Sequence, residues 1–280
     1  MTTDFRVEKP LSLVQLEENI RHCGRVKKYP NGRVEILVCN RPVFREDGWD
    51  SVTPKKKRRP SEDADQMDID GWLTGDDPAL ANIRRAQRRA RSRVRDLALC
   101  CPFRYFVTLT LDPAKIDRYD INAITKRLNV WLDNRVRRKG LSYVLVPEHH
   151  KDGAIHFHGF FNDALRAVDS GLRDKGGHPI FNLPEWDFGF TTAIELYGDY
   201  DAAVSYVCKY IGKEMSADAL PEKIGGRWYY SGGVLQRPEV ELFDCCAEDY
   251  EGREDAFTFE IPQAGLKFTR IMTKLEENVE

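Results

Sequence analysis

Residues 148–161 read EHHKDGAIHFHGFF, and this stretch decides how the chain is expected to fold. Ile155–Phe161 has the β-branched and aromatic composition of a strand, and the apolar segment Leu141–Glu148 is a suitable partner. The tripeptide at 151–153, Lys-Asp-Gly, fits a three-residue loop with Gly153 in the left-handed conformation. The stretch therefore predicts an antiparallel hairpin.

His156 and His158 are separated by one residue in this predicted strand, so their side chains share a face. With a three-residue loop, Glu148 pairs with His156 and lies on the same face, whereas a two-residue turn would send it to the other. One carboxylate and two imidazoles suit Mg²⁺ or Mn²⁺ acting on a phosphate, although imidazole also binds Zn²⁺. We predict a divalent-metal site formed by Glu148, His156 and His158, with Mg²⁺ or Mn²⁺ favoured and His150 as a weaker reserve ligand.

The pattern has a simpler alternative, in which the two histidines are polar residues on a solvated face. Four of the six histidines of the chain fall within residues 149–158, however, and a carboxylate is expected to face two of them. This concentration favours the metal site.

A second motif, in residues 201–213, has the spacing of an amphipathic helix. Its apolar stripe consists of Val204, Val207, Cys208 and Ile211, and the opposite stripe of Tyr206, Lys209, Tyr210 and Lys213. Each tyrosine is followed three residues later by a lysine, and such a cation favours the phenolate and can hold a phosphate. The tyrosines are therefore predicted nucleophiles, with Lys209 and Lys213 as activating and phosphate-positioning groups. The alternative is that the tyrosines are boundary residues and the lysines a solvated face.

Three motifs now stand in order: a buried strand at Phe106–Asp112, the Glu148 and HxH set, and the tyrosine helix. Together they resemble the HUH endonucleases, specifically rolling-circle replication initiators of small phages and plasmids, of the filamentous-phage gene II type or the two-tyrosine type. The resemblance covers roughly residues 77–240. Relaxases of this superfamily carry the tyrosine ahead of the histidines, and its single-tyrosine transposases lack the second tyrosine; both stay open as alternatives.

An amphipathic helix from Asp120 to Lys139, ended by Gly140, and a strand pair around residues 186–196 complete the expected elements. Their order predicts an α+β fold, and the resemblance implies the same HUH-endonuclease fold: a central antiparallel sheet carrying the HxH strand, with helices packed on one face.

The resemblance also implies metal-dependent nicking of one strand at an origin, giving a 5′-phosphotyrosine and a 3′-hydroxyl, and rejoining of strands at termination. The implied partners are single-stranded or supercoiled origin DNA, a host helicase and a host DNA polymerase. No G-x-x-x-x-G-K-[ST] loop occurs, so no nucleotide cofactor is expected.

Two other classes of function remain open. A non-catalytic nucleic-acid-binding module would bind without a covalent adduct. A metal-dependent phosphoesterase using activated water would need the metal site but neither tyrosine.

The net charge of the 280-residue chain is only −2, but the charges are segregated. Residues 84–95 contain seven arginines and no acid, and Lys55–Arg59 adds five cations. Pro78 and the apolar spacing that follows it predict a helix ending before Pro102. We predict that this helix contacts DNA phosphates, the alternative being a solvated charged helix; its candidate DNA-binding residues are Arg84, Arg85, Arg88, Arg89, Arg91, Arg93 and Arg95.

Four regions are predicted. Residues 1–45 hold a small unit with a hairpin turned at 30–32, and residues 46–76 have the composition of a disordered linker. Residues 77–240 form the endonuclease domain, and 241–280 an acidic tail with one possible strand at 256–261. No apolar run approaches the roughly 20 residues of a membrane span, and seven cysteines without a C-x-x-C pair fit reduced thiols. We expect a cytoplasmic protein of a bacterial host cell, encoded by a phage or plasmid.

Overall fold

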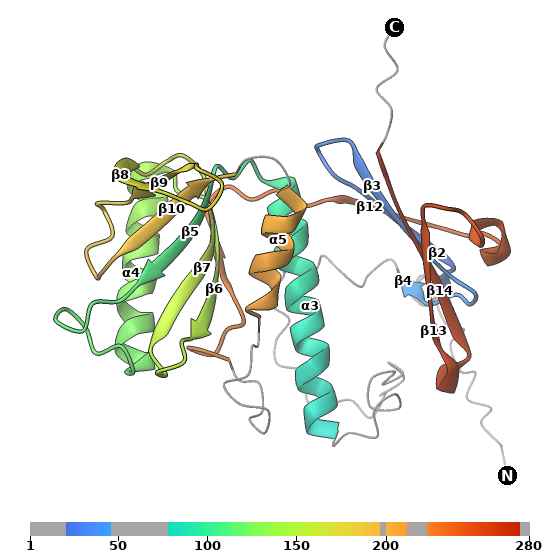
Figure 1. The fold of residues 1–280 in the computed structure, drawn as a ribbon. Helices are drawn as coiled ribbons and strands as arrows, with labels where there is room; N and C mark the ends of the chain where they lie inside the picture. Colours follow the sequence, from blue (N-terminus) through green and yellow to red (C-terminus); the bar gives the residue numbers. More distant parts are fainter. Residues whose placement is uncertain (1–20, 46–77, 197–199, 212–222, 275–280) are drawn as a thin grey trace, which may run out of the picture. The chain divides into compact units, whose positions relative to one another are not determined.

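A computed structural model describes residues 21–45, 78–196, 200–211 and 223–274. The chain divides into two compact units: residues 74–238, here the larger unit, and residues 1–73 together with 239–280, the smaller unit. Across the described residues, helices combine with antiparallel sheets, as the α+β prediction requires (Figure 1). No helix in these ranges is both long enough and apolar enough to span a membrane.

The larger unit is built on a seven-stranded antiparallel sheet with the order β11-β6-β7-β5-β10-β9-β8. The histidine strand β7 lies inside it, between β6 and β5. The elements in chain order are α3 (Pro78–Cys100), β5 (Tyr105–Thr110), α4 (Ile121–Lys139), β6 (Tyr143–His149), β7 (Ile155–Phe161), β8 (Val168–Arg173), β9 (Pro179–Asn182), β10 (Thr191–Glu195), α5 (Tyr200–Lys209) and β11 (Tyr230–Gly232).

Helix α4 shows how local sequence sets the boundaries of an element. The Asp120 carboxylate accepts hydrogen bonds from the backbone N–H groups of Asn122 and Ala123, both at 3.0 Å, and so caps the first turn. Gly140 ends the helix in the left-handed conformation, with φ of 73°. The predicted bounds are confirmed, and the buried stripe contains Ile124, Leu128, Trp131 and Leu132.

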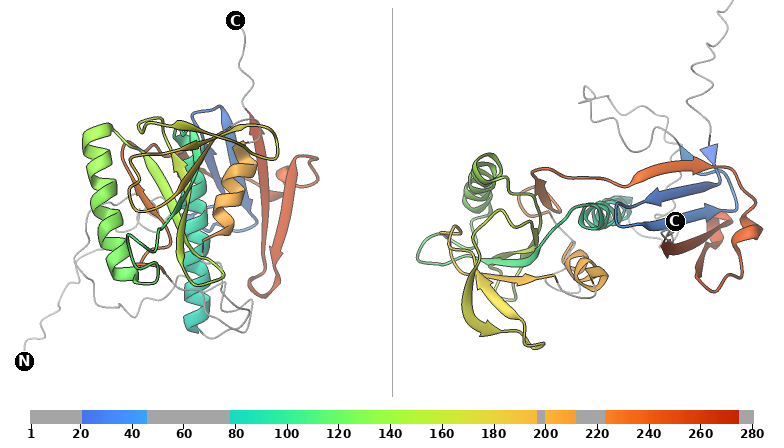
Figure 2. Two further views of the ribbon diagram at one scale, coloured as in Figure 1. Left: turned by 60° about the vertical axis from the view of Figure 1, so that its left-hand side comes forward. Right: turned by 90° about the horizontal axis from the view of Figure 1, so that it is seen from above.

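The two faces of the large sheet are covered by different helices. Odd-numbered strand residues such as Leu109 and Phe157 share a core with the buried stripe of α4. Even-numbered residues such as Phe106 and His158 contact α5 instead. Figures 1 and 2 show α4 on one side of the sheet and α5 on the other. The expectation that the helices share one face is therefore wrong, because alternate strand residues are apolar on both sides and each face buries its own helix.

The predicted register of the β6–β7 hairpin is confirmed. Glu148 pairs with His156, and the His150 N–H donates to the Ala154 carbonyl at 2.8 Å. Gly153 has a φ of 84°, as a left-handed loop residue should. This loop places Glu148 on the face of the two histidines.

Gly159 allows β6 and β7 to approach closely. A Cβ atom at this position would lie 1.9 Å from the Val144 carbonyl oxygen, which belongs to the backbone and cannot turn away. We expect Gly159→Ala to destabilise the protein by about 3 kcal/mol or more, at the upper end of overpacking costs. Gly140→Ala is the control, because its Cβ would meet nothing within 4 Å and only the positive φ adds strain. Thermal unfolding of both variants measures the difference, and equal destabilisation would contradict the close-approach explanation.

Part of the large sheet differs from the sequence expectation. Instead of a strand pair around residues 186–196, Trp186 lies in a loop and only β10 occupies that range. The hairpin of β8 and β9 precedes it, and its turn ends at Gly177 with φ of 83°. The signal for this hairpin is the turn composition Asp-Lys-Gly-Gly at 174–177.

The smaller unit is a five-stranded sheet with the order β12-β2-β3-β14-β13, and β1 (Arg21–His22) pairs separately with β4 (Phe44–Arg45). Its remaining elements are β2 (Gly24–Lys28), β3 (Arg33–Cys39), β12 (Glu239–Phe243), η2 (Ala247–Tyr250), β13 (Ala256–Ile261), η3 (Pro262–Ala264) and β14 (Leu266–Lys274). The N-terminal hairpin and the strand at 256–261 agree with the sequence.

The acidic tail predicted at 241–280 is a correction. Within it β14 pairs with β3 over seven residues of each strand, and β12 pairs with β2, so the C-terminal segment completes the N-terminal sheet. The reason is that a two-stranded hairpin alone buries too little apolar surface to be stable. The linker predicted at 46–76 lies outside the described residues.

Candidate active site

The centre of the site is a contact between β6 and β7. The His158 Nε2 atom lies 2.9 Å from a Glu148 carboxylate oxygen, and both side chains are nearly buried, with exposures of 12% and 10%. On the other edge of the ring, His158 Nδ1 lies 3.1 Å from the Thr108 hydroxyl of β5. Three neighbouring strands therefore hold the imidazole in one orientation.

His156 lies directly opposite Glu148 in the strand register. Its ring is stacked on that of His150, with centroids 4.9 Å apart. Burial lowers the pKa of His156, and the neighbouring His150 and His158 lower it further. The neutral imidazole is therefore favoured, and this is the form whose lone pair can bind a metal.

The donor set fits a divalent cation in part. Two adjacent ligands, each about 2.1 Å from an octahedral metal, lie about 3 Å apart, which matches the Glu148 to His158 distance of 2.9 Å. Thr108 can accept a proton from Nδ1 and leave Nε2 for the metal. Within the part of the chain that the structure describes, however, no three His, Cys, Asp or Glu side chains are already gathered to hold an ion. Completing the predicted set requires the His156 ring to turn from His150 toward the other two.

Helix α5 carries the predicted tyrosines and ends earlier than expected. It spans Tyr200–Lys209, and Tyr210 and Ile211 follow in a tighter turn whose N–H groups bond three residues back. The predicted apolar stripe is confirmed, since Val204, Val207 and Ile211 are buried. Lys209 is exposed at the end of the helix, and Lys213 lies outside the described residues.

Both tyrosines lie against the histidine strand. The Tyr210 ring is stacked on His158, with centroids 4.2 Å apart and an interplanar angle of 13°. Tyr206 meets Tyr210 edge to face at 5.1 Å and packs against Phe106 of β5 at 5.7 Å. Residues from three distant stretches of sequence thus form one cluster, the tyrosine–histidine cluster: Phe106, Glu148, His158, Tyr206 and Tyr210.

The two phenols differ in environment. Tyr206 is 47% exposed, so a substrate can reach it directly. Burial raises the pKa of the Tyr210 phenol, and the neighbouring Tyr206 and Glu148 raise it further. Tyr210 is therefore neutral near pH 7, and it must lose its proton to a base before or during any nucleophilic attack.

Sequence reasoning missed the residues that orient the cluster. Thr108 and Phe106 alternate on the same face of β5 and contact His158 and Tyr206, and strand parity was the signal that could have found them. Tyr200 anchors the start of α5 by donating a hydrogen bond of 2.6 Å to the Ala98 carbonyl of α3. No local signal indicates that contact, because it joins segments 102 residues apart.

The arginine helix α3 has the predicted bounds, but its arginines differ in their surroundings. Arg88, Arg89 and Arg91 are exposed, whereas Arg84, Arg85, Arg93 and Arg95 are half-buried. Arg91 also donates a hydrogen bond of 3.0 Å to the Ile211 carbonyl, so it supports the turn that carries Tyr210. Its removal would disturb the tyrosine–histidine cluster as well as any binding to DNA.

DNA binding by α3 is best tested at Arg88 and Arg89. We expect the double Ala variant to bind DNA of any sequence more weakly, and the slope of affinity against salt to fall by about 0.9 for each phosphate that the helix no longer neutralises. Binding measured over a range of salt concentrations gives the slope, with the exposed Lys175→Ala as a control. A slope equal to that of the unaltered protein would make α3 a solvated charged helix.

The aromatic segment at 227–233 is partly a packing element. Tyr230 lies in β11 and is only 1% exposed, in the core beneath the large sheet. Arg227 lies over its ring, 5.4 Å from the centroid. Tyr230 is thus unable to stack on a DNA base.

One protein family matches the chain. Residues 104–215, less than half of the sequence, match the family of replication-associated proteins that comprises ORF2 and the gene II protein. The matched range runs from β5 to just beyond the tyrosines and so contains the whole tyrosine–histidine cluster. The match supports a replication initiator family and a role in replication initiation. No curated protein and no solved structure matches the chain.

Proposed function

We propose that this protein is an endonuclease that nicks one DNA strand at a replication origin by tyrosine attack. The observation that carries the proposal is the stacking of Tyr210 on His158, which itself contacts Glu148. A phenol beside a carboxylate and imidazole pair combines a nucleophile with groups able to hold a cation at a phosphate. The family match to replication-associated proteins supports the same assignment.

The proposed reaction is a transesterification. A phenol oxygen of Tyr206 or Tyr210 forms a bond to the scissile phosphorus, and the bond from phosphorus to the 3′ oxygen breaks. The phenol proton leaves and the 3′ oxygen gains a proton, so the products are a 5′-phosphotyrosine and a free 3′-hydroxyl. The phosphodiester bond is conserved, and the later rejoining of strands therefore needs no energy source.

The side chains around the phenols take distinct roles in this scheme. Glu148, His156 and His158 would hold Mg²⁺ or Mn²⁺, which when bound offsets negative charge on the non-bridging phosphate oxygens. Lys209 and Lys213 are assigned to phosphate positioning and phenol activation. Thr108 keeps the His158 ring in place.

Two tyrosines suit the two halves of a replication cycle. While one phenol is esterified to the 5′ end, termination requires a second nucleophile at the same place. The rings of Tyr206 and Tyr210 are 5.1 Å apart, so both can serve one phosphate site. A host helicase would unwind the duplex and a host DNA polymerase would extend the 3′-hydroxyl.

The deciding experiment is incubation of the full chain with supercoiled origin plasmid and with single-stranded origin DNA, in the presence of Mn²⁺, followed by a denaturing gel. A nicked strand with protein attached to its 5′ end is the expected product. Binding without cleavage would favour a non-catalytic nucleic-acid-binding module. Cleavage without attached protein would favour a phosphoesterase that uses activated water.

A further inference from the structure

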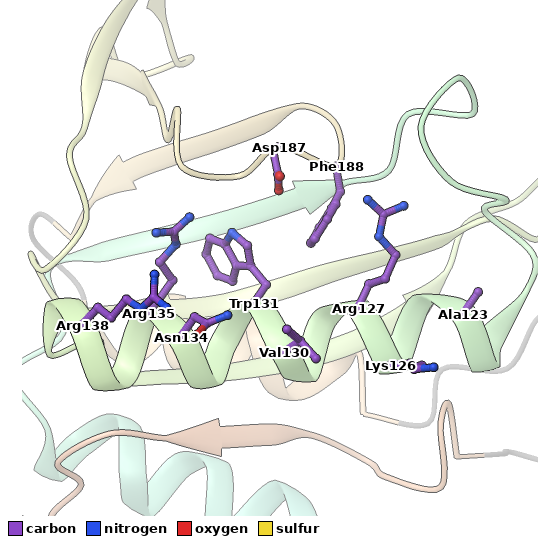
Figure 3. A pocket seen from close by; sticks show the side chains of 10 residues that line it. All are labelled: Ala123, Lys126, Arg127, Val130, Trp131, Asn134, Arg135, Arg138, Asp187 and Phe188. Atoms are coloured by element: carbon purple, nitrogen blue, oxygen red, sulfur yellow. The ribbon is translucent and has the colours of Figure 1, made fainter.

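A groove of about 550 Å³ lies along α4, on the side of the large sheet opposite the tyrosine–histidine cluster. One wall is the exposed side of α4, and the other is the loop before β10 that carries Asp187 and Phe188 (Figure 3). The tyrosine chemistry leaves this groove without a role.

The groove is strongly cationic. Its lining contains Lys126, Arg127, Arg135 and Arg138 against a single carboxylate, that of Asp187. All four cations come from one helix, and Lys126, Arg127 and Arg138 are exposed to solvent. Such a surface is complementary to a polyanion.

Two of the cations are held in place by interactions with the protein. Arg127 donates to the Lys115 carbonyl at 2.9 Å, and its guanidinium lies 4.5 Å from the centroid of the Phe188 ring. Arg135 donates to the Glu185 carbonyl at 3.3 Å and lies 5.4 Å from the Trp131 ring. A guanidinium has five N–H donors, so each keeps donors for a ligand and loses little side-chain entropy on binding it.

The aromatic rings of the groove indicate what kind of polyanion fits. Trp131 and Phe188 are only 5% and 8% exposed, and Figure 3 shows Arg127 and Arg135 on either side of them. These rings are covered and cannot stack on the bases of a single strand. Lys126 and Arg138 are twelve residues apart, about 18 Å along a helix, and phosphates of one duplex strand recur about every 3.4 Å along the axis. The groove can therefore follow several phosphates of a duplex backbone.

We infer that the α4 groove binds the phosphate backbone of duplex DNA beside the strand that enters the tyrosine site. The inference rests on the proposed function only in taking DNA as the substrate class, and it does not require cleavage. Holding the duplex on the opposite side of the sheet would give the protein a grip on the origin that is separate from the nicked strand.

The test compares two double variants of the full chain. Lys126→Ala with Arg138→Ala removes two exposed groove cations that pack against no core residue, and Arg137→Ala with Lys139→Ala removes the same charge from the same helix outside the groove. Anisotropy of a short labelled duplex, and of one strand alone, is measured over a range of salt concentrations. Thermal unfolding establishes that both variants are folded.

We expect the groove variant to lose about one to two orders of magnitude in duplex affinity near 0.1 M salt, with a salt slope smaller by up to about 1.8. Single-strand affinity and single-strand nicking should remain unchanged. Equal weakening in both double variants, or weakening confined to the single strand, would overturn the inference. So would groove-dependent binding of poly-glutamate with an unchanged DNA slope, which would make the occupant an acidic protein segment. Because duplex binding is measured without cleavage, a failure of the nicking proposal is recognised separately.

Discussion

The Tyr206→Phe, Tyr210→Phe double variant is expected to form no covalent adduct with origin DNA. Both hydroxyls near His158 are removed while both rings remain, so the stacking at 4.2 Å and the edge contact at 5.1 Å can persist. Without a phenol, the reaction has no nucleophile on the protein. A denaturing gel of the reaction with Mn²⁺ measures the adduct, and duplex and single-strand binding should be unchanged.

Each single Phe variant should keep some initial nicking, because the two phenols lie side by side. Closure of a circle should be impaired in both, since the second nucleophile is then missing at termination. Tyr200→Phe is the matched control: its phenol lies on the same helix but donates to the Ala98 carbonyl. This control should retain full adduct formation.

Mass spectrometry of the protease-digested adduct identifies the attacking residue. A phosphotyrosine found on one residue only, with the other Phe variant fully able to close circles, would make this a one-tyrosine enzyme. Adduct formation by the double variant at the normal rate would remove the tyrosine mechanism altogether.

The second large effect is expected for His158→Ala. This ring contacts Glu148 at 2.9 Å, Thr108 at 3.1 Å and Tyr210 at 4.2 Å, so its removal takes away a proposed ligand and the support of a phenol together. Loss of about 4 kcal/mol of charge stabilisation at the phosphate corresponds to roughly a thousandfold lower nicking rate. DNA affinity should change little, since phosphate binding comes mainly from arginines.

Binding of Mn²⁺, measured by calorimetry, separates the two contributions. We expect His158→Ala to lose Mn²⁺ binding, and His178→Ala to keep both binding and nicking, because His178 lies in the exposed turn between β8 and β9. Unimpaired nicking by His158→Ala in Mn²⁺ would exclude the proposed metal role. Abolished nicking with retained Mn²⁺ binding would assign His158 to holding Tyr210.

Local chemistry allowed much of the large unit to be predicted. The cap and the left-handed glycine of α4, the proline at the start of α3 and the loop at 151–153 all act within a few residues, so their effects can be read from neighbouring positions. The face shared by Glu148, His156 and His158 followed from loop length and strand parity alone. The candidate catalytic residues could therefore be named before any tertiary contact was known.

Other features depend on contacts between segments far apart in sequence. The joining of the C-terminal strands to the N-terminal hairpin is one of them, and the seating of Tyr210 on His158 is another. Neither follows from local propensity, because edge strands and amphipathic helices carry no address for the surface they will cover.

The sequence by itself thus determined the elements, the hairpin register and the residue types of the site, since these depend on period, caps and turn chemistry. Only the tertiary structure decided that α4 and α5 cover opposite faces of the sheet, that Arg91 supports the turn after α5, and that four cations of α4 line one groove. Those outcomes depend on which apolar surfaces are buried together, and burial is a property of the whole packed unit.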